Sequence, residues 1–119
     1  MSGFVRQQQD IEYSPVGAAD GLEKGVLVDA DSGADVALRR FTLVAGGSVP
    51  EHTNAIEHEQ YVLDGEYIVG IDDTEHSVAP GDTVHIPAGT VHWYRNEGDR
   101  EAAFLCAVPA GDDTIRLLG

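Results

Sequence analysis

Three of the five histidines stand beside turn residues in a way that suits metal binding. His52 and His58 flank the short polar segment 53–57, and His92 follows the Pro-Ala-Gly turn at residues 87–89. Imidazole is the commonest protein ligand for zinc, iron, copper and nickel. Three imidazoles with open coordination positions can bind a metal and still admit water or substrate. The pattern therefore predicts one divalent transition metal ion, such as Fe, Mn, Ni, Cu or Zn.

The other two histidines are expected to lie outside this centre. His76 directly follows a polar turn, and a lone histidine in a β protein is usually a surface residue. His85 lies between Val84 and Ile86. Successive side chains of a strand point to opposite faces, so His85 points outward if its two neighbours enter the core.

The elements that must position these residues read as short β-strands. Fourteen glycines and five prolines punctuate the 119 residues, and no segment combines a sustained helical period with caps. Regular strands of this kind argue for an all-β sandwich or barrel. The expected strands cover residues 25–29, 36–44 (followed by a turn at 45–47), 60–63, 67–71, 76–78, 83–86, 91–95 and 102–108. Asp64-Gly65 is a strong β-hairpin signal between two of them.

The domain organisation is expected to be simple. Residues 25–119 are predicted to form a single β-barrel domain. Residues 1–24 are predicted to form an N-terminal arm, either flexible or added as an edge strand to a partner.

The charge balance limits the classes of partner. Twenty-one acidic and seven basic residues give a net charge of −14, spread along the chain, and Lys24 is its single lysine. Either the surface meets a cationic partner, or the chain is adapted to high salt as in a halophile; the diffuse charge favours the second. A nucleic-acid backbone would be repelled, so no such partner is expected.

Cysteine content and hydropathy favour a cytoplasmic location. Cys106 is the single cysteine, so no intrachain disulfide can form. No apolar run approaches the roughly 18 residues of a membrane span, and the first ten residues lack the apolar core of a signal peptide. No membrane partner is expected.

Two segments resemble the paired motifs of the cupin superfamily. Residues 46–65, GGSVPEHTNAIEHEQYVLDG, resemble the first motif, and residues 81–96, GDTVHIPAGTVHWYRN, resemble the second. The second motif is matched by Gly81, Pro87, Gly89, His92 and Asn96. The spacer between the motifs, residues 66–80, is short, as in small microbial cupins. The resemblance implies an antiparallel double-stranded β-helix, the jelly-roll barrel of the cupins.

The resemblance also implies a ligand set, with two departures from the family pattern. The metal ligands are expected to be His52, Asn54, His58 and His92. Asn54 stands where the first motif has its second histidine, and His58 takes the place of the glutamate. Asn54 either gives an oxygen ligand or leaves the position to water.

The assignment of His58 depends on the register of one strand. Counting alternate residues back from Gly65 turns His58 inward. A slip of one residue would present Glu57 or Glu59 instead.

Residues that follow the expected ligands belong to the same cavity. Gln60 and Tyr94 stand two positions after His58 and His92, so both are expected to face the cavity and bind a small-molecule substrate. Trp93 should face the opposite way. Cys106 lies in an apolar run and reads as a buried small hydrophobe.

Two classes of function follow from the resemblance. The first is a small metalloenzyme acting on an organic molecule, either dioxygenase-like or similar to sugar isomerases and lyases. The alternative is a non-catalytic binding or sensing module with a weak or vestigial metal site. A homodimer is expected, because small cupins commonly pair their sheets and the outward apolar residues Tyr61, Leu63 and Trp93 need a cover.

Overall fold

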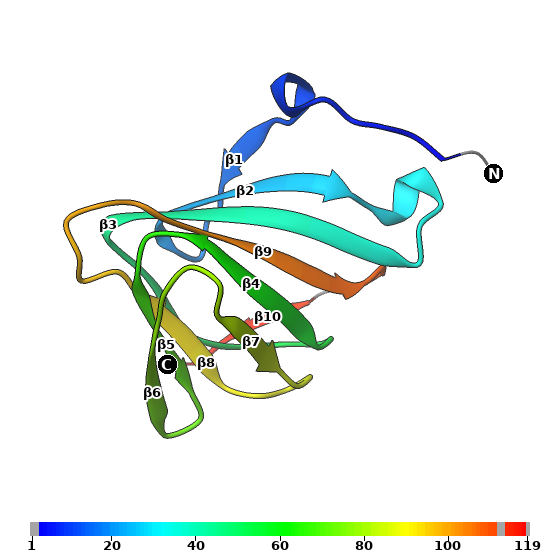
Figure 1. Cartoon of the computed structure of the whole chain (residues 1–119). Coiled ribbons are helices and arrows are strands. Elements are labelled where there is room, and N and C mark those ends of the chain that lie inside the picture. Colours follow the sequence, from blue (N-terminus) through cyan, green and yellow to red (C-terminus); the bar gives the residue numbers. More distant parts are fainter. Residues whose placement is uncertain (1–2, 112–113, 119) are drawn as a thin grey trace.

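One continuous antiparallel sheet curls on itself to form the molecule, as seen in a computed structural model that describes residues 3–111 and 114–118 (Figure 1). The strands are β1 (Tyr13–Pro15), β2 (Asp20–Val28), β3 (Val36–Asn54), β4 (His58–Asp64), β5 (Tyr67–Ile71), β6 (Thr74–Val78), β7 (Thr83–Ile86), β8 (His92–Arg95), β9 (Ala102–Pro109) and β10 (Ile115–Leu117). Two single 3-10 turns, η1 (Gln8–Asp10) and η2 (Ala30–Ser32), complete the described elements. The prediction of an all-β barrel is confirmed. No helix in the described ranges has the length and apolar character needed to cross a membrane.

The long strand β3 carries the chain across the barrel. Its first half pairs with β2 and β9, and its second half pairs with β8 and β10. The break predicted at residues 45–47 is wrong, because β3 bends there and continues. Gly46 has a φ of 79°, and a Cβ on Gly47 would lie 2.8 Å from the Leu43 side chain. The two glycines therefore permit a bend where other residues would be strained.

The Asp64-Gly65 pair makes a turn but not a hairpin. Strand β4 pairs with β7 and β9, whereas β5 pairs with β6 and β8, so the hairpin prediction is wrong. Gly65 has a φ of 70°, and an added Cβ would overlap the Glu101 carbonyl oxygen. The glycine is needed for a close approach of two backbones as the chain passes from one side of the barrel to the other.

The apolar core holds the two sides of the barrel together. Leu43, Val62 and Val69 are fully buried within it. The Asn96 amide ties the nearby turn, donating to the carbonyls of Leu43 (3.1 Å) and Arg100 (2.9 Å) while its oxygen accepts from the Gly98 amide.

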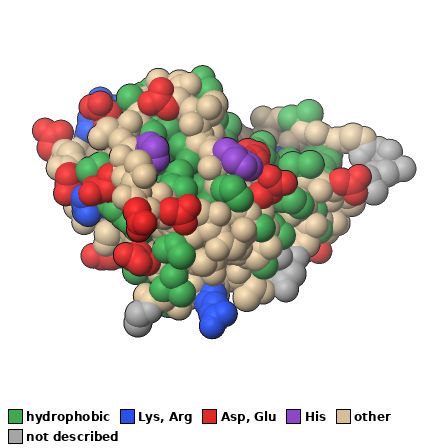
Figure 2. Space-filling view, turned by 90° about the horizontal axis from the view of Figure 1, so that it is seen from below, with side chains coloured by type: hydrophobic (Ala, Val, Ile, Leu, Met, Phe, Trp, Pro, Cys, Tyr) green, Lys and Arg blue, Asp and Glu red, His purple; other side chains and the backbone are tan. Residues whose placement is uncertain are grey.

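On the face shown in Figure 2, acidic side chains lie at several separate places, and Lys and Arg lie at few.

The side chain of Trp93 on β8 is half-buried. Its ring lies against Gly70 of β5, and the guanidinium carbon of Arg95 lies 4.7 Å from the centre of the ring.

Candidate metal centre

A bulge in β3 aims His52 and Asn54 into the barrel. Val49 is buried, Pro50 and Glu51 are both exposed, and the register with β8 shifts between Val49 and His52. Strict alternation from Val49 would have turned Glu51 inward, so the extra residue resets the pattern. Proline suits this position because it has no N–H to lose from the ladder.

His92 lies directly opposite His52 across the β3–β8 pair. The two rings have centroids 4.1 Å apart, and His92 is 1 % exposed. Gly89, with a φ of 76°, makes the turn that brings β8 back into the barrel. Turn and register together place the two imidazoles side by side.

His58 opens β4 and also points inward. It is buried, while Glu57 and Glu59 are exposed, so the register predicted from Gly65 is confirmed. Its ring centroid lies 6.1 Å from that of His92. The structure thus brings the three predicted histidines to one part of the barrel interior.

Backbone carbonyls fix the tautomers of two of these rings. Nδ1 of His52 donates to the Pro50 carbonyl at 2.8 Å, and Nδ1 of His92 donates to the Thr90 carbonyl at 2.9 Å. Because a carbonyl only accepts, Nδ1 carries the proton in each neutral ring and Nε2 keeps the lone pair that a metal binds.

Asn54 supplies an oxygen acceptor in the same place. The residue is 5 % exposed, and its Oδ1 has no hydrogen-bond partner among the described residues. A buried acceptor of this kind costs free energy unless a ligand satisfies it. Imidazole nitrogens with one amide oxygen form a donor set suited to a divalent transition metal, so the residues present fit such an ion.

These side chains share a cavity of about 130 Å³. Its lining includes His52, Asn54, His58, Gln60, His92 and Tyr94. The predicted orientation of Gln60 and Tyr94 is confirmed, and Gln60 Nε2 donates to the Tyr94 hydroxyl at 2.6 Å. Gln60 Oε1 is buried and has no hydrogen-bond partner in the described ranges.

Arg39 and Cys106 also belong to this region, although neither was predicted to be a site residue. Arg39 is 6 % exposed, lines the cavity and donates to Cys106 Sγ at 3.4 Å. Cys106 Sγ lies 3.4 Å from His58 Nδ1. Burial alone would raise the pKa of the thiol, but its hydrogen bonds and the charges of His58 and Arg39 outweigh burial and lower that pKa. Alternation from Leu43 back along β3 could have placed Arg39 inside.

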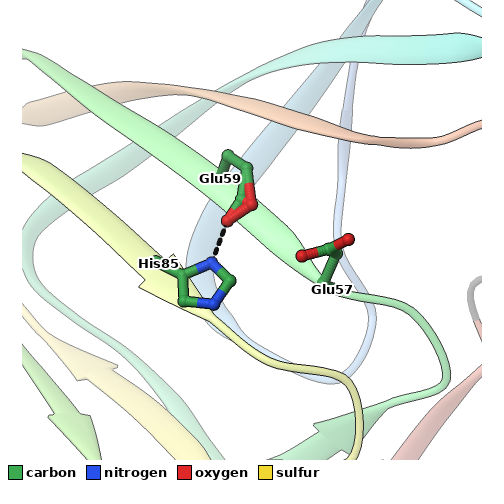
Figure 3. Close-up of side chains that lie close together, drawn as sticks. All are labelled: Glu57, Glu59 and His85. Carbon is green, nitrogen blue, oxygen red and sulfur yellow. Dashed lines mark hydrogen bonds and ion pairs between the residues drawn. The ribbon is translucent and has the colours of Figure 1, made fainter.

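A second group of metal-ligating side chains lies on the outer face of the barrel. Glu57, Glu59 and His85 are all exposed and bring their ligand atoms within 4.8 Å of one another (Figure 3). Glu59 accepts a hydrogen bond from His85 Nδ1, and this bond raises the pKa of His85. The raised pKa favours the protonated ring, which competes with metal binding at that nitrogen. His76 is exposed as well, so both outward predictions are confirmed.

Comparison with known proteins finds the same architecture. The family model described as "Cupin domain" matches residues 39–108. The polyketide cyclase RemF from Streptomyces resistomycificus is 28% identical, with a TM-score of 0.88 over 100% of this chain and 87% of that one. A cupin 2 conserved barrel domain protein from Rhodopseudomonas palustris is 27% identical, with a TM-score of 0.82 over 92% and 79%.

A third structure, Rru_A2000 from Rhodospirillum rubrum, is described as a cupin-2 domain and shares the fold. It is 24% identical, with a TM-score of 0.83 over 100% of this chain and 82% of that one. No protein with a curated description matches this chain. The predicted jelly-roll barrel of the cupins is confirmed.

Proposed function

The chain belongs to the cupin domain family, and we propose that it holds one divalent transition metal ion and acts on a small organic molecule. The proposed ligands are His52, His58, His92 and the amide oxygen of Asn54. The observation that carries the proposal is the shared cavity, which collects three inward imidazoles beside a buried acceptor without a partner among the described residues.

The side chains of the cavity define what the chain itself contributes. When bound, the ion would act as a Lewis acid toward the substrate. The backbone bonds to Nδ1 hold the His52 and His92 rings in place, which limits the reorganisation needed on binding. Gln60 and Tyr94 would orient the substrate by hydrogen bonding.

The cavity also bears on the reaction class. Its described lining contains no Asp or Glu, so no carboxylate in that part of the chain is placed to act as general base. This supports chemistry centred on the ion, either dioxygenase-like or similar to the sugar isomerases and lyases. The volume of about 130 Å³ is well under the roughly 300–1,000 Å³ of sites for drug-sized ligands, which favours a substrate smaller than a polyketide.

The second candidate is a non-catalytic binding or sensing module. The same lack of a carboxylate in the described lining favours it, as does Asn54 in place of a histidine. The two candidates differ in turnover: an enzyme consumes a diol, diketone, flavonol or sugar from a test panel, whereas a sensor binds its ligand unchanged.

Metal analysis tests the premise that both candidates share. Protein purified without a histidine tag and supplied in turn with Fe(II), Mn(II), Ni(II), Cu(II) and Zn(II) should retain about one ion per chain. His92→Ala should lose that ion, and His85→Ala, its exposed control on β7, should keep it. A metal content far below one ion per chain with every metal, or loss of the ion in the His85 variant but not in the His92 variant, would contradict the proposal.

A homodimer in the cytoplasm completes the proposal. Tyr61 is 47 % exposed and Leu63 is 36 % exposed, and both stand on the outer face of β4, where a second copy would cover them. Light scattering after gel filtration should give twice the chain mass, and a monomer at micromolar concentration would contradict this. The single cysteine supports the location, since no intrachain disulfide is available.

A further inference from the structure

The three proposed histidine ligands are held in two different ways. For His52 and His92, the backbone carbonyl two residues earlier accepts a hydrogen bond from Nδ1. Nδ1 of His58 lies instead 3.4 Å from the sulfur of Cys106, which is 48 positions further along the chain. This contact connects the ring of His58 on β4 to a side chain of β9.

The pairing of β4 with β9 brings the two side chains together. Cys106 lies opposite Gln60 in that pairing. Gln60 and His58 are both buried, and alternate residues of a strand share one face. Cys106 is therefore a diagonal neighbour of His58 across the strand pair, which is within reach of long side chains. Cys106 is 0 % exposed, so bulk water does not compete for the contact.

The sulfur of Cys106 is placed to accept hydrogen bonds. Arg39 donates to it from Nη2 at 3.4 Å. A guanidinium group only donates, so the sulfur already serves as an acceptor on that side. When Nδ1–H of His58 donates to the same sulfur, the ring keeps its lone pair on Nε2. That is the arrangement already described for His52 and His92.

Cys106 itself is not placed as a metal ligand. His58 and Asn54 line the cavity, whereas Cys106 does not. The sulfur lies beside Nδ1 of His58, and the proposed ligand atom of that ring is Nε2. The metal site has separate support, since Oδ1 of Asn54 is buried in the same lining and has no hydrogen-bond partner among the described residues.

We infer that Cys106 is a positioning residue of the metal centre, whose sulfur holds Nδ1 of His58 and so directs Nε2 of that ring to the ion. The inference rests on the proposed function, because His58 is one of the four proposed ligands. Partners of this kind fix the tautomer and orientation of a ligating histidine. Of the three Nδ1 contacts described, this one is made by a side chain, so a single substitution removes it.

NMR of the metal-free protein, at a pH where the imidazoles are neutral, tests the contact directly. Long-range proton–nitrogen correlation spectra distinguish a ring protonated on Nδ1 from one protonated on Nε2. His58 should carry its proton on Nδ1 in the wild type and in Cys106→Ser, whose hydroxyl oxygen also accepts. The proton should move toward Nε2 in Cys106→Ala. A wild-type ring protonated on Nε2, or a tautomer unchanged by Cys106→Ala, would overturn the inference.

Zinc titration of the same variants tests whether the contact matters to the metal. Cys106→Ala should bind Zn(II) about tenfold to a hundredfold more weakly than the wild type, whereas Cys106→Ser should stay within a few-fold of it. Val84→Ala is the matched control, because Val84 is buried and lies opposite Gln60 on β7, as Cys106 does on β9. This control loses packing but no hydrogen bond, so its His58 tautomer and zinc affinity should match those of the wild type.

The outcomes keep the two claims distinguishable. Zinc affinity unchanged in Cys106→Ala would overturn the positioning role alone. A sulfur-to-cobalt charge-transfer band in the Co(II)-loaded wild type that Cys106→Ser lacks would make Cys106 a ligand and would also overturn that role. A wild type that binds none of the metals would overturn the proposed metal function and the positioning role together. The wild-type NMR spectrum needs no substitution, so it decides the contact even if Cys106→Ala fails to fold.

Discussion

Replacing Asn54 by leucine should separate the stability of the barrel from its metal affinity. Asn54 is 5 % exposed and its Oδ1 has no hydrogen-bond partner in the described part of the chain. A buried polar group in that condition costs about 1–3 kcal/mol. Leucine has a similar volume and no acceptor, so the free energy of unfolding of the metal-free variant should be about 1 kcal/mol higher than that of the wild type. For a domain of this size that is a rise of about 4 °C in melting temperature.

The same substitution should weaken metal binding, because it removes the proposed oxygen ligand. Loss of even a hydrogen bond that supports a ligand costs about tenfold to a hundredfold in affinity, so Zn(II) should bind at least about tenfold more weakly. Scanning calorimetry with EDTA and with Zn(II) measures both effects, since bound metal adds stability in proportion to the logarithm of its affinity.

Asn54→Asp is the matched control for this experiment. It keeps an oxygen and adds a charge, so it should bind Zn(II) more tightly than the wild type and be less stable in EDTA. The reasoning fails if Asn54→Leu is less stable than the wild type in EDTA and binds Zn(II) equally well.

Other parts of the barrel give three further predictions. Glu59→Gln should lower the pKa of His85 in an NMR titration, because the hydrogen bond to Glu59 raises that pKa in the folded protein. The pair therefore stabilises the folded protein at pH values below the pKa of His85 in the unfolded chain, and this stabilisation is lost as the pH rises through the pKa of the folded protein. An unchanged titration would show that the pair does not form. Gly65→Ala should cost about 2 kcal/mol or more in urea unfolding, since its φ is 70° and a Cβ would overlap the Glu101 carbonyl; a loss no larger than that of Gly81→Ala, whose Cβ would meet nothing within 4 Å, would contradict this. The melting temperature should be higher in roughly 1 M KCl than in roughly 0.1 M KCl, because the salt shortens the Debye length from about 10 Å to about 3 Å and so screens the repulsion within a chain of net charge −14. A melting temperature that stays the same or falls as KCl is added would refute the high-salt interpretation.

The candidate site was predictable from the sequence where local turns fix side-chain direction. The Pro-Ala-Gly turn before β8 and the glycine after β4 set the registers of His92 and His58, and both face inward as predicted. His52 is different, because alternation from Val49 alone would have turned Glu51 inward. Its orientation depends on the bulge, and only the spacing shared with the cupin motif anticipated it.

Strand pairing was less predictable, because it depends on residues far apart in the chain. The Asp64-Gly65 turn has the chemistry of a hairpin, yet β4 finds its partners in β7 and β9. Residues 45–47 contain turn glycines, yet β3 bends at them without ending, because different strands pair with its two halves. Arg39 was missed because a basic residue in a strand is usually exposed, whereas its burial follows from the curvature of the whole barrel.

Anomalous diffraction at the zinc edge, from crystals of Zn(II)-supplied protein, tests the central claim most directly. We predict one strong peak inside the barrel, about 2.0–2.2 Å from Nε2 of His52, His58 and His92 and from Oδ1 of Asn54. A peak only on the outer face between Glu59 and His85, or none within the barrel, would contradict the account.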